Sequence, residues 1–254
     1  MGHTALIMAA SNIFITGASQ GIGRAVALTL ASEGHHLCLA ARNTEALTQV
    51  RDEISSAGGT ATVCTVDVTE PEALTNSMRE ADDELGGFDT VIANAGVTVG
   101  RWSGKMTYED IAPIIDVNVK GAAATMLALL PRMVARKRGH LVGISSLARY
   151  RATPKMAAYS ASKAFFSAFM EGLRLDLQTT GVAVTDIRPG FVDTELVAGM
   201  KRMPFLLSPD QAAQKIVSAI HRQVRVAEFP FPMARFMRTL ARLPDAAYER
   251  AVRR

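Results

Sequence analysis

The sequence predicts one α/β domain with a doubly wound parallel sheet of about seven strands and helices on both faces. Short apolar runs alternate with longer segments of helical periodicity along the 254 residues, and several of the runs are apolar at every position. Runs of that kind are typical of parallel strands that helices cover on both sides. No linker rich in Pro, Gly or Ser divides the chain, so we treat residues 1–254 as a single domain.

Seven apolar runs are the predicted strands. Each is short, and each is bounded by turn residues or by a helical segment. In order along the chain they are Asn12–Thr16, His36–Ala41, Thr60–Val66, Thr90–Ala93, His140–Ser145, Val182–Ile187 and Arg225–Phe229.

Helix signals fill the segments between the strands. Arg24–Glu33 follows the first strand, and Tyr159–Gln178 is long and has few charges, so we expect more than one of its faces to be buried. The run Ser208-Pro209-Asp210-Gln211 combines an N-cap serine, a proline at the first helical position and a glutamine three residues after the cap. It predicts a helix that continues to about Arg222.

Composition and charge exclude several classes of protein. With 48% apolar and 20% charged residues the chain is not disordered, and its net charge of +4 comes from residues 201–254, which hold 11 basic and 4 acidic side chains. No reading motif or basic stripe with aromatics predicts nucleic-acid binding. Cys38 and Cys64 lie in apolar stretches and are interpreted as small buried hydrophobes rather than a disulfide or metal site. Met1–Ser11 lacks a Lys or Arg before its short apolar run, and a cytoplasmic location is expected.

A glycine-rich turn follows the first predicted strand. Thr16-Gly17-Ala18-Ser19-Gln20-Gly21-Ile22-Gly23 comes directly before a helical run. Glycines there allow a tight turn, and the free N–H groups and the dipole at the helix N-terminus attract a pyrophosphate. A structural turn is the alternative, but the position favours a Rossmann-type dinucleotide site.

The end of the second strand predicts which dinucleotide is bound. An acidic residue for the ribose hydroxyls is expected about 20 residues after the glycine turn, but the strand ends Ala40-Ala41-Arg42-Asn43. A small neutral side chain does not repel an extra phosphate, and a guanidinium binds it well. We therefore predict NADP(H), with Arg42 as the phosphate ligand rather than only a solvated strand-end arginine.

A Tyr and a Lys four residues apart form the candidate reactive pair. On a helix Tyr159 and Lys163 project from the same face. A neighbouring ammonium favours tyrosinate, so we expect the Tyr159 pKa to lie below its ordinary value near 10 and the phenol to serve as a general acid or base. Ser145 and Ser146 end the fifth predicted strand, which is also where strands often pass into loops.

Taken together, these residues resemble the short-chain dehydrogenases/reductases from about Asn12 to Thr194. The motifs occur in the family's order along the chain. They are the glycine turn, Asp67-Val68, Asn94-Ala95-Gly96, Asn118 in Asn118-Val119-Lys120-Gly121, Ser146, the Tyr159/Lys163 pair and Pro189-Gly190.

The resemblance implies a role for each matching residue. Ser146 would hydrogen-bond the substrate oxygen, Tyr159 would exchange a proton with it, and Lys163 would bind the nicotinamide ribose. Lys163, the Asn118 backbone and a water would form a proton path, so the catalytic set is Asn118, Ser146, Tyr159 and Lys163. The cofactor-binding set it implies is Gly17, Ser19, Gln20, Gly21, Ile22, Gly23, Arg42, Asn43, Asp67, Val68, Asn94, Gly96, Tyr159, Lys163, Pro189, Gly190, Val192 and Thr194. Within it, Asp67 and Val68 would contact adenine, and Val192 and Thr194 the carboxamide.

The segment 195–207 is the region that covers the substrate in the resembling family. Met200, Met203 and Phe205 predict an apolar, adaptable lining and hence a hydrophobic ketone or secondary alcohol, although packing of an amphipathic helix would give the same pattern. Arg149 and Arg151 leave open a 3-oxoacyl-carrier or acyl-CoA reductase. A non-catalytic NADP(H)-binding sensor is a further alternative, which the intact Ser, Tyr and Lys disfavour.

The tail at 231–254 predicts a basic amphipathic helix. We expect it to pack across the interface of a homodimer or homotetramer, because the resembling family often forms such assemblies. Contact with an anionic membrane surface is the alternative.

Overall fold

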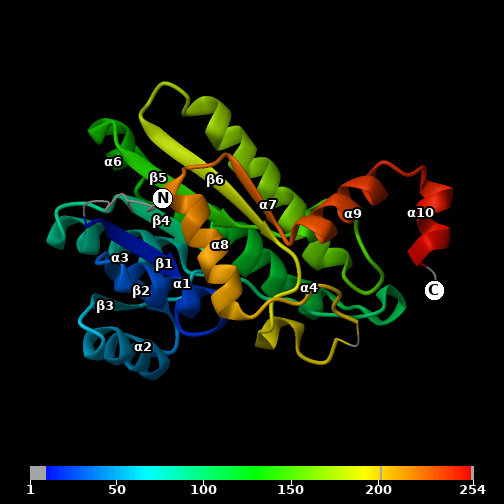
Figure 1. Ribbon diagram of the computed structural model, residues 1–254, viewed down its shortest axis with the longest axis horizontal. Coiled ribbons are helices and arrows are strands. Elements are labelled where there is room, and N and C mark those ends of the chain that lie inside the picture. Colours follow the sequence, from blue (N-terminus) through cyan, green and yellow to red (C-terminus); the bar gives the residue numbers. More distant parts are fainter. Residues whose placement is uncertain (1–9, 201, 253–254) are drawn as a thin grey trace, which may run out of the picture.

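The computed structural model describes residues 10–200 and 202–252. Most of the N-terminal stretch Met1–Ser11, Lys201 of the lid segment and the last two arginines of the tail lie outside the described residues. The chain forms a seven-stranded sheet in the order β3-β2-β1-β4-β5-β6-β7, and every neighbouring pair is parallel. Helices cover both faces of this sheet (Figure 1), so the predicted fold class is confirmed.

The strands fall where the apolar runs predict them, with ends shifted by at most two residues. They are β1 (Asn12–Thr16), β2 (His36–Ala41), β3 (Thr60–Thr65), β4 (Thr90–Ala93), β5 (Gly139–Ile144), β6 (Val182–Pro189) and β7 (Val226–Phe229). The strand order reverses between β1 and β4. In open parallel sheets, the crevice at the carboxyl ends of such neighbouring strands is the usual ligand site.

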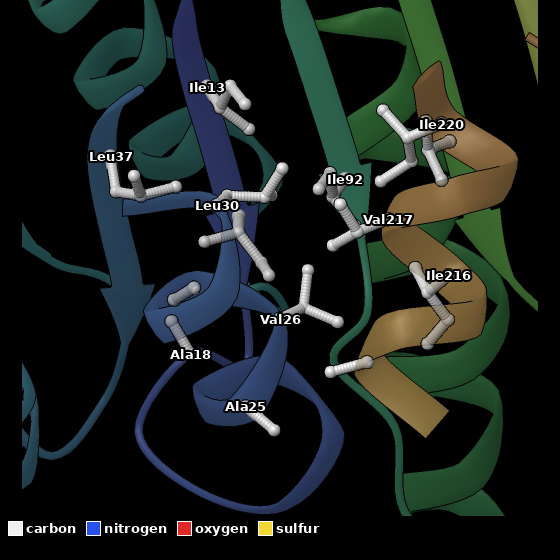
Figure 2. Close-up of a cluster of buried hydrophobic side chains, with 14 of the residues drawn as sticks. Ile13, Ala18, Ala25, Val26, Leu30, Leu37, Ile92, Ile216, Val217 and Ile220 are labelled. Atoms are coloured by element: carbon white, nitrogen blue, oxygen red, sulfur yellow. The ribbon is translucent and has the colours of Figure 1, made fainter. Parts of the chain in front are cut away.

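Three helices cover one face of the sheet: α1 (Gly21–Ser32), α2 (Thr44–Ser56) and α8 (Pro209–His221). In Figure 2, Val26 of α1 projects toward α8, and Val217 of α8 lies beside Ile92 of β4. The predicted cap of α8 is present: the Ser208 hydroxyl accepts from the Gln211 N–H at 3.1 Å, and the Gln211 side chain accepts from the Ser208 N–H at 3.0 Å.

The second face carries a core of its own, under α3 (Pro71–Glu84), α5 (Ala122–Leu127), α6 (Leu130–Arg136) and α7 (Ala157–Asp176). Phe14 and Phe88 meet edge to face at 5.5 Å between ring centres. Cys38 belongs to this core and Cys64 packs against it, both as free thiols. Both cysteines therefore behave as the small hydrophobes that their surroundings predict.

The stretch Tyr108–Arg136 is an apolar, mostly helical run with a short bend at 128–129. It comprises α4 (Tyr108–Ile115), a π-helical turn η2 (Asp116–Gly121), α5 and α6. An 18-residue window in it has a mean hydropathy of 1.4, which by length and composition alone would suffice to cross a membrane. In the fold, however, 44% of that window is buried, and its helices contact α3 and α7. Its apolar character is therefore that of a core helix.

The basic tail forms two helices rather than one. They are α9 (Phe231–Ala241) and α10 (Asp245–Val252), and they extend beyond the end of the sheet in Figure 1. The break falls at 242–244, where Pro244 has no N–H to continue the hydrogen bonds of α9. Ala234 and Met237 of α9 are buried against Leu147 in the loop after β5. The inner face of α9 is thus covered by the loop after β5 of the same chain.

Candidate active site

A cavity of about 1090 Å³ opens at the carboxyl ends of the strands. Its lining comes from the glycine turn after β1, the ends of β2, β4, β5 and β6, helix α7, the segment after β6, and both tail helices. Most residues predicted as sites from the sequence meet here. Those that line it are Gly17, Ser19, Gln20, Gly21, Ile22, Arg42, Asn43, Asp67, Val68, Asn94, Gly96, Ser146, Tyr159, Lys163, Pro189, Gly190, Val192 and Thr194.

Backbone geometry explains the glycines of the turn. Gly17 has a φ of +67° and Gly21 a φ of +55°, both in the left-handed region that side chains disfavour. A Cβ on Gly23 would lie 2.1 Å from the Gly17 carbonyl oxygen. Gly23 is outside the cavity lining, so it lets α1 approach the turn and does not itself face a ligand.

Asn94 fixes the turn from the neighbouring strand. Its amide donates at 3.0 Å to the carbonyls of both Thr16 and Gly17. The Thr16 hydroxyl in turn accepts from the Asn94 N–H at 3.2 Å. These bonds hold β1 and β4 together just before the cavity and fix the position of the turn that leads into α1.

Arg42 stands at the mouth of the cavity with 72% of its side chain exposed. Its closest acidic neighbour is Asp67, at 3.6 Å between Nη1 and Oδ2. An exposed ion pair of that length contributes little free energy, so the guanidinium is available for a phosphate. Asn43 accepts from the Ala46 N–H at 3.0 Å and caps α2, whose N-terminus therefore begins beside Arg42.

Ser146, Tyr159 and Lys163 converge on the opposite part of the cavity. Ser146 follows β5, and its hydroxyl accepts from the Ala148 N–H at 3.1 Å. Lys163, 6% exposed, donates to the Ile144 carbonyl at 3.0 Å, and its Nζ lies 5.8 Å from the centre of the Tyr159 ring. The strand end and one face of α7 thus present a hydroxyl, a phenol and an ammonium to the same space.

Burial dominates the titration of this pair. It raises the pKa of Tyr159 above its ordinary value, while a hydrogen bond with Ser146 acts in the opposite direction. The expected lowering of the Tyr159 pKa by Lys163 is therefore wrong. Burial destabilises the phenolate more than the hydrogen bond with Ser146 stabilises it. Burial also lowers the pKa of Lys163 to about 8.

Asn118 lies behind the cavity rather than in its lining. It sits in the π-helical turn, 1% exposed, and its amide donates to the Val97 carbonyl at 2.9 Å and to the Ser162 hydroxyl at 3.0 Å. A Cβ on Gly96 would lie 3.5 Å from both the Asn118 Oδ1 and the Lys163 Nζ. Asn118 therefore supports the wall next to Lys163.

The segment after β6 lines the substrate end only in part. Leu196, Met200 and Phe205 face the cavity, whereas Met203, which we expected beside them, does not. The short helix η4 (Glu195–Val197) contacts the glycine turn through a 3.1 Å hydrogen bond from Gln20 to Glu195. This bond joins the segment to the turn across the cavity.

The tail supplies a wall that sequence reasoning missed. The side chains involved are apolar or aromatic: Met233, Phe236, Met237, Leu240, Tyr248, Ala251 and Val252. The alternation of these side chains with arginines is visible in the sequence, but it does not say which surface covers them. In the structure, they cover the substrate end of their own chain's cavity.

Helix α10 is attached to the loop after Ser146 by three contacts. The Tyr248 hydroxyl donates to the Ala152 carbonyl at 2.6 Å, and Arg151 pairs with Asp245 at 2.6 Å. Arg151 also lies 4.4 Å above the Tyr248 ring centre. Arg149 is the last residue of η3 (Leu147–Arg149), and its guanidinium stacks over the ring of the next residue, Tyr150. Neither arginine lines the cavity.

The residues present fit a nicotinamide dinucleotide. The glycine turn offers N–H groups at the start of α1, Arg42 offers a cation for a 2′-phosphate, and Lys163 offers donors at the far end. A Cβ on Gly17 would lie 2.9 Å from the Ala95 Cα, so the turn needs glycine to reach this position.

A second cluster of polar side chains lies elsewhere in the described residues. The ligand atoms of Glu33, His35 and His221 lie within 4.8 Å of one another, and none of these residues lines the cavity.

Comparison with known proteins gives a consistent result. The model of a family described as short chain dehydrogenase matches residues 11–204. An uncharacterized oxidoreductase of Myxococcus xanthus (strain DK1622) is 46% identical over 241 residues, which are 94% of this chain and 95% of the relative.

Two solved structures have the same fold. A short-chain dehydrogenase from Sphingobium yanoikuyae in complex with NADPH superposes with a TM-score of 0.82 at 27% identity, covering 95% of this chain and 94% of that one. A short chain dehydrogenase/reductase from Burkholderia phymatum in complex with NAD gives a TM-score of 0.84 at 24% identity, covering 90% and 92%. The second likeness concerns the fold alone.

Proposed function

The chain belongs to the short-chain dehydrogenase family of oxidoreductases, and we propose that it reduces hydrophobic ketones to secondary alcohols with NADPH and catalyses the reverse oxidation. One observation carries the proposal: Ser146, Tyr159 and Lys163 meet in the cavity whose other end holds the glycine turn and Arg42. A proton donor and a dinucleotide cradle in one cavity are what carbonyl reduction needs.

Each side chain has a distinct task in this reaction. When bound, the nicotinamide supplies or accepts the hydride. Ser146 donates a hydrogen bond to the carbonyl oxygen and orients it toward Tyr159. The Tyr159 hydroxyl gives its proton to the developing alkoxide, and its raised pKa keeps the phenol protonated until then. The Lys163 ammonium stabilises the phenolate that remains.

The preference for NADPH depends on Ala41 and Arg42. A neutral side chain ends β2, and the exposed Arg42 is next to the capped N-terminus of α2. Both features favour a phosphate on the adenosine ribose. The NADPH bound by the Sphingobium yanoikuyae relative supports this proposal.

The substrate end favours an apolar compound. Met200, Phe205, Met237 and Leu240 line it together with further apolar side chains from the tail. Thioethers adapt to varied shapes, and apolar walls gain free energy with each apolar group that they bury. Small polar ketones should therefore be poor substrates.

A 3-oxoacyl reductase remains the second candidate, because a thioester-linked oxoacyl chain is also a hydrophobic ketone. It would need cations for the carrier or CoA phosphate. Arg151 is occupied by Asp245 and Tyr248, and Arg149 stacks on Tyr150. These contacts favour free ketones over carrier-bound ones.

One assay separates these possibilities. NADPH consumption is followed by absorbance over free ketones of increasing apolar size, a small polar ketone and an oxoacyl-CoA. We expect free hydrophobic ketones to be turned over, with kcat/KM rising with apolar bulk. Turnover of only the oxoacyl-CoA would select the second candidate, and NADPH binding without turnover of any substrate would indicate a sensor.

We also propose a cytoplasmic homodimer or homotetramer. Phe165 and Leu175 on α7 are 44% and 58% exposed, which supports an association surface there. The free thiols of Cys38 and Cys64 fit a reducing compartment. Sedimentation equilibrium of the purified protein tests the assembly, and fractionation of cells tests the location.

A further inference from the structure

A network of buried charges lies behind the reactive side chains. Asp186 of β6 is 1% exposed, and Arg188, two residues further along the strand, is 8% exposed. The Arg188 Nε donates to the Asp186 Oδ2 at 2.7 Å, and its Nη1 donates to the Glu228 Oε1 at 2.9 Å. A carboxylate buried to this degree is costly unless it is paired and hydrogen-bonded.

The two oxygens of Asp186 bind the two elements that carry the reactive groups. Oδ1 accepts from the Ser145 hydroxyl at 2.5 Å, and Oδ2 accepts from the Ser167 hydroxyl. Ser145 directly precedes Ser146 at the end of β5. Ser167 lies four residues after Lys163 and therefore on the same face of α7.

Lys163 has few charged neighbours in this setting. Its own helix presents Tyr159, β5 presents the Ile144 carbonyl, and the π-helical side presents the neutral Asn118. Asp186 is the carboxylate whose charge acts on the ammonium, and it raises the pKa of Lys163 against the larger effect of burial. Arg188 faces Asp186, and Glu228, which also pairs with Arg238 at 3.1 Å, completes the network on the side of β7 and α9.

We infer that Asp186 is a positioning residue for the proposed reaction: its carboxylate ties the strand end that carries Ser146 to the helix that carries Lys163. Its negative charge also favours the ammonium form of Lys163 against the larger effect of burial. The inference rests on the proposed function for its catalytic consequence. The electrostatic part concerns this chain alone and is measurable without substrate.

The charge of Lys163 can be followed directly. The chain has seven lysines, so protein labelled with ¹³C at the lysine ε-carbon gives a short list of NMR signals, and the signal missing from Lys163→Met identifies Lys163. In the unmodified protein we expect a titration midpoint near pH 8. In Asp186→Asn we expect the midpoint to move to lower pH by about one pH unit, because an opposite charge has been removed.

Glu228→Gln is the matched control. It also removes a buried carboxylate from Arg188, but on the side facing Tyr150 and Arg238 rather than Ser145 and Ser167. We expect its Lys163 midpoint to equal that of the unmodified protein. Equal midpoints in Asp186→Asn and the unmodified protein, or equal shifts in both variants, would overturn the inference.

Activity provides the second readout. In ketone reduction, the fall of kcat/KM at alkaline pH should begin at lower pH in Asp186→Asn and be unchanged in Glu228→Gln. If the unmodified protein reduces no ketone, the proposed function fails, while the NMR midpoint still tests the charge of Lys163.

Folding is the remaining variable, because Asp186→Asn leaves Arg188 with one carboxylate. The double variant Asp186→Asn/Arg188→Gln removes both halves of the pair and still lacks the carboxylate near Lys163. Circular dichroism and thermal unfolding show which of these two variants folds, and Lys163 is titrated in that variant. Loss of folding in both variants would assign Asp186 to the stability of the fold alone and reject the inference.

Discussion

Burial shifts the pKa values of the two titratable residues of the reactive site in opposite directions. Burial raises the pKa of Tyr159 and lowers that of Lys163 to about 8. Near neutral pH, this leaves a protonated phenol beside an ammonium. A site of this composition is prepared to donate a proton, which is the direction that carbonyl reduction requires.

Tyr159→Phe tests the proton donor at the scale of one residue. The substitution removes the hydroxyl and retains the ring, so we expect kcat to fall by about 100- to 10,000-fold. The Kd for NADPH, measured by fluorescence titration, should stay within about threefold because the ribose donor Lys163 is unchanged. Turnover close to that of the unmodified enzyme would rule out Tyr159 as the general acid.

The double variant Ala41→Asp/Arg42→Leu tests cofactor choice. It adds a carboxylate where the ribose hydroxyls are expected and removes the cation that faces the phosphate. A hydrogen bond to a charged group contributes about 1.5–3 kcal/mol, so the NADPH to NADH ratio of kcat/KM should fall by about 10- to 150-fold. An unmodified enzyme that already prefers NADH would contradict the role of Arg42.

At the scale of elements, the segment after β6 separates into residues that face the cavity and residues that do not. Met200 lines the cavity and Met203 does not. We expect Met200→Ala to shift the best ketone toward larger ones, by about 0.8 kcal/mol for each methylene that fills the new space. Met203→Ala is the matched control and should leave the size profile of kcat/KM unchanged. Equal profiles for both variants would exclude the segment as a substrate wall.

Helix α10 forms part of the cavity wall and is attached to the loop after Ser146 by few contacts, so removing one of them tests its role. Tyr248→Phe removes the hydrogen bond to the Ala152 carbonyl, which contributes about 0.5–1.5 kcal/mol. A looser α10 should raise KM for bulky apolar ketones by about two- to tenfold and leave KM for small ketones unchanged. Hydrogen exchange of residues 245–252 should become faster in the same variant. A uniform rise of KM for all ketones would contradict a wall function.

At the scale of the whole molecule, the sheet itself contains a group sensitive to acid. His140 on β5 is 3% exposed, and burial lowers its pKa to about 4. The Thr185 hydroxyl donates to the Val224 carbonyl at 2.7 Å and therefore accepts from the His140 Nε2, which lies 2.8 Å away. The folded state thus contains neutral His140.

Acid should therefore weaken the fold through His140. Between pH 6.5 and about 4, the unfolded chain binds a proton that the folded chain does not, so the free energy of unfolding falls as the pH falls. By pH 4.5 this effect amounts to about 2.5 kcal/mol. Urea unfolding at pH 7 and pH 4.5 measures how far the free energy of unfolding falls between the two pH values. This fall should be smaller by about 2.5 kcal/mol in His140→Asn than in the unmodified protein. Parallel drops in both proteins would show that His140 does not control this transition.

The strands and the glycine turn could be predicted from the sequence because their signals are local. A strand buried on both faces is apolar at successive positions, as in β1 and β2, and those bounds match the structure. Gly17 and Gly21 mark backbone conformations that other residues rarely adopt. The i to i+4 spacing of Tyr159 and Lys163 places them on one helix face wherever the helix lies.

Tertiary structure alone decided the surroundings of those residues. The apolar pattern of the tail predicts a covered face, but only the path of the chain shows that α9 and α10 cover the cavity of their own chain. Likewise, the charge on Lys163 depends on its depth in the protein and on Asp186, which follows it by 23 residues in the sequence. Local conformation is specified by neighbouring residues, whereas burial and electrostatic pairing depend on residues that only the folded chain brings together.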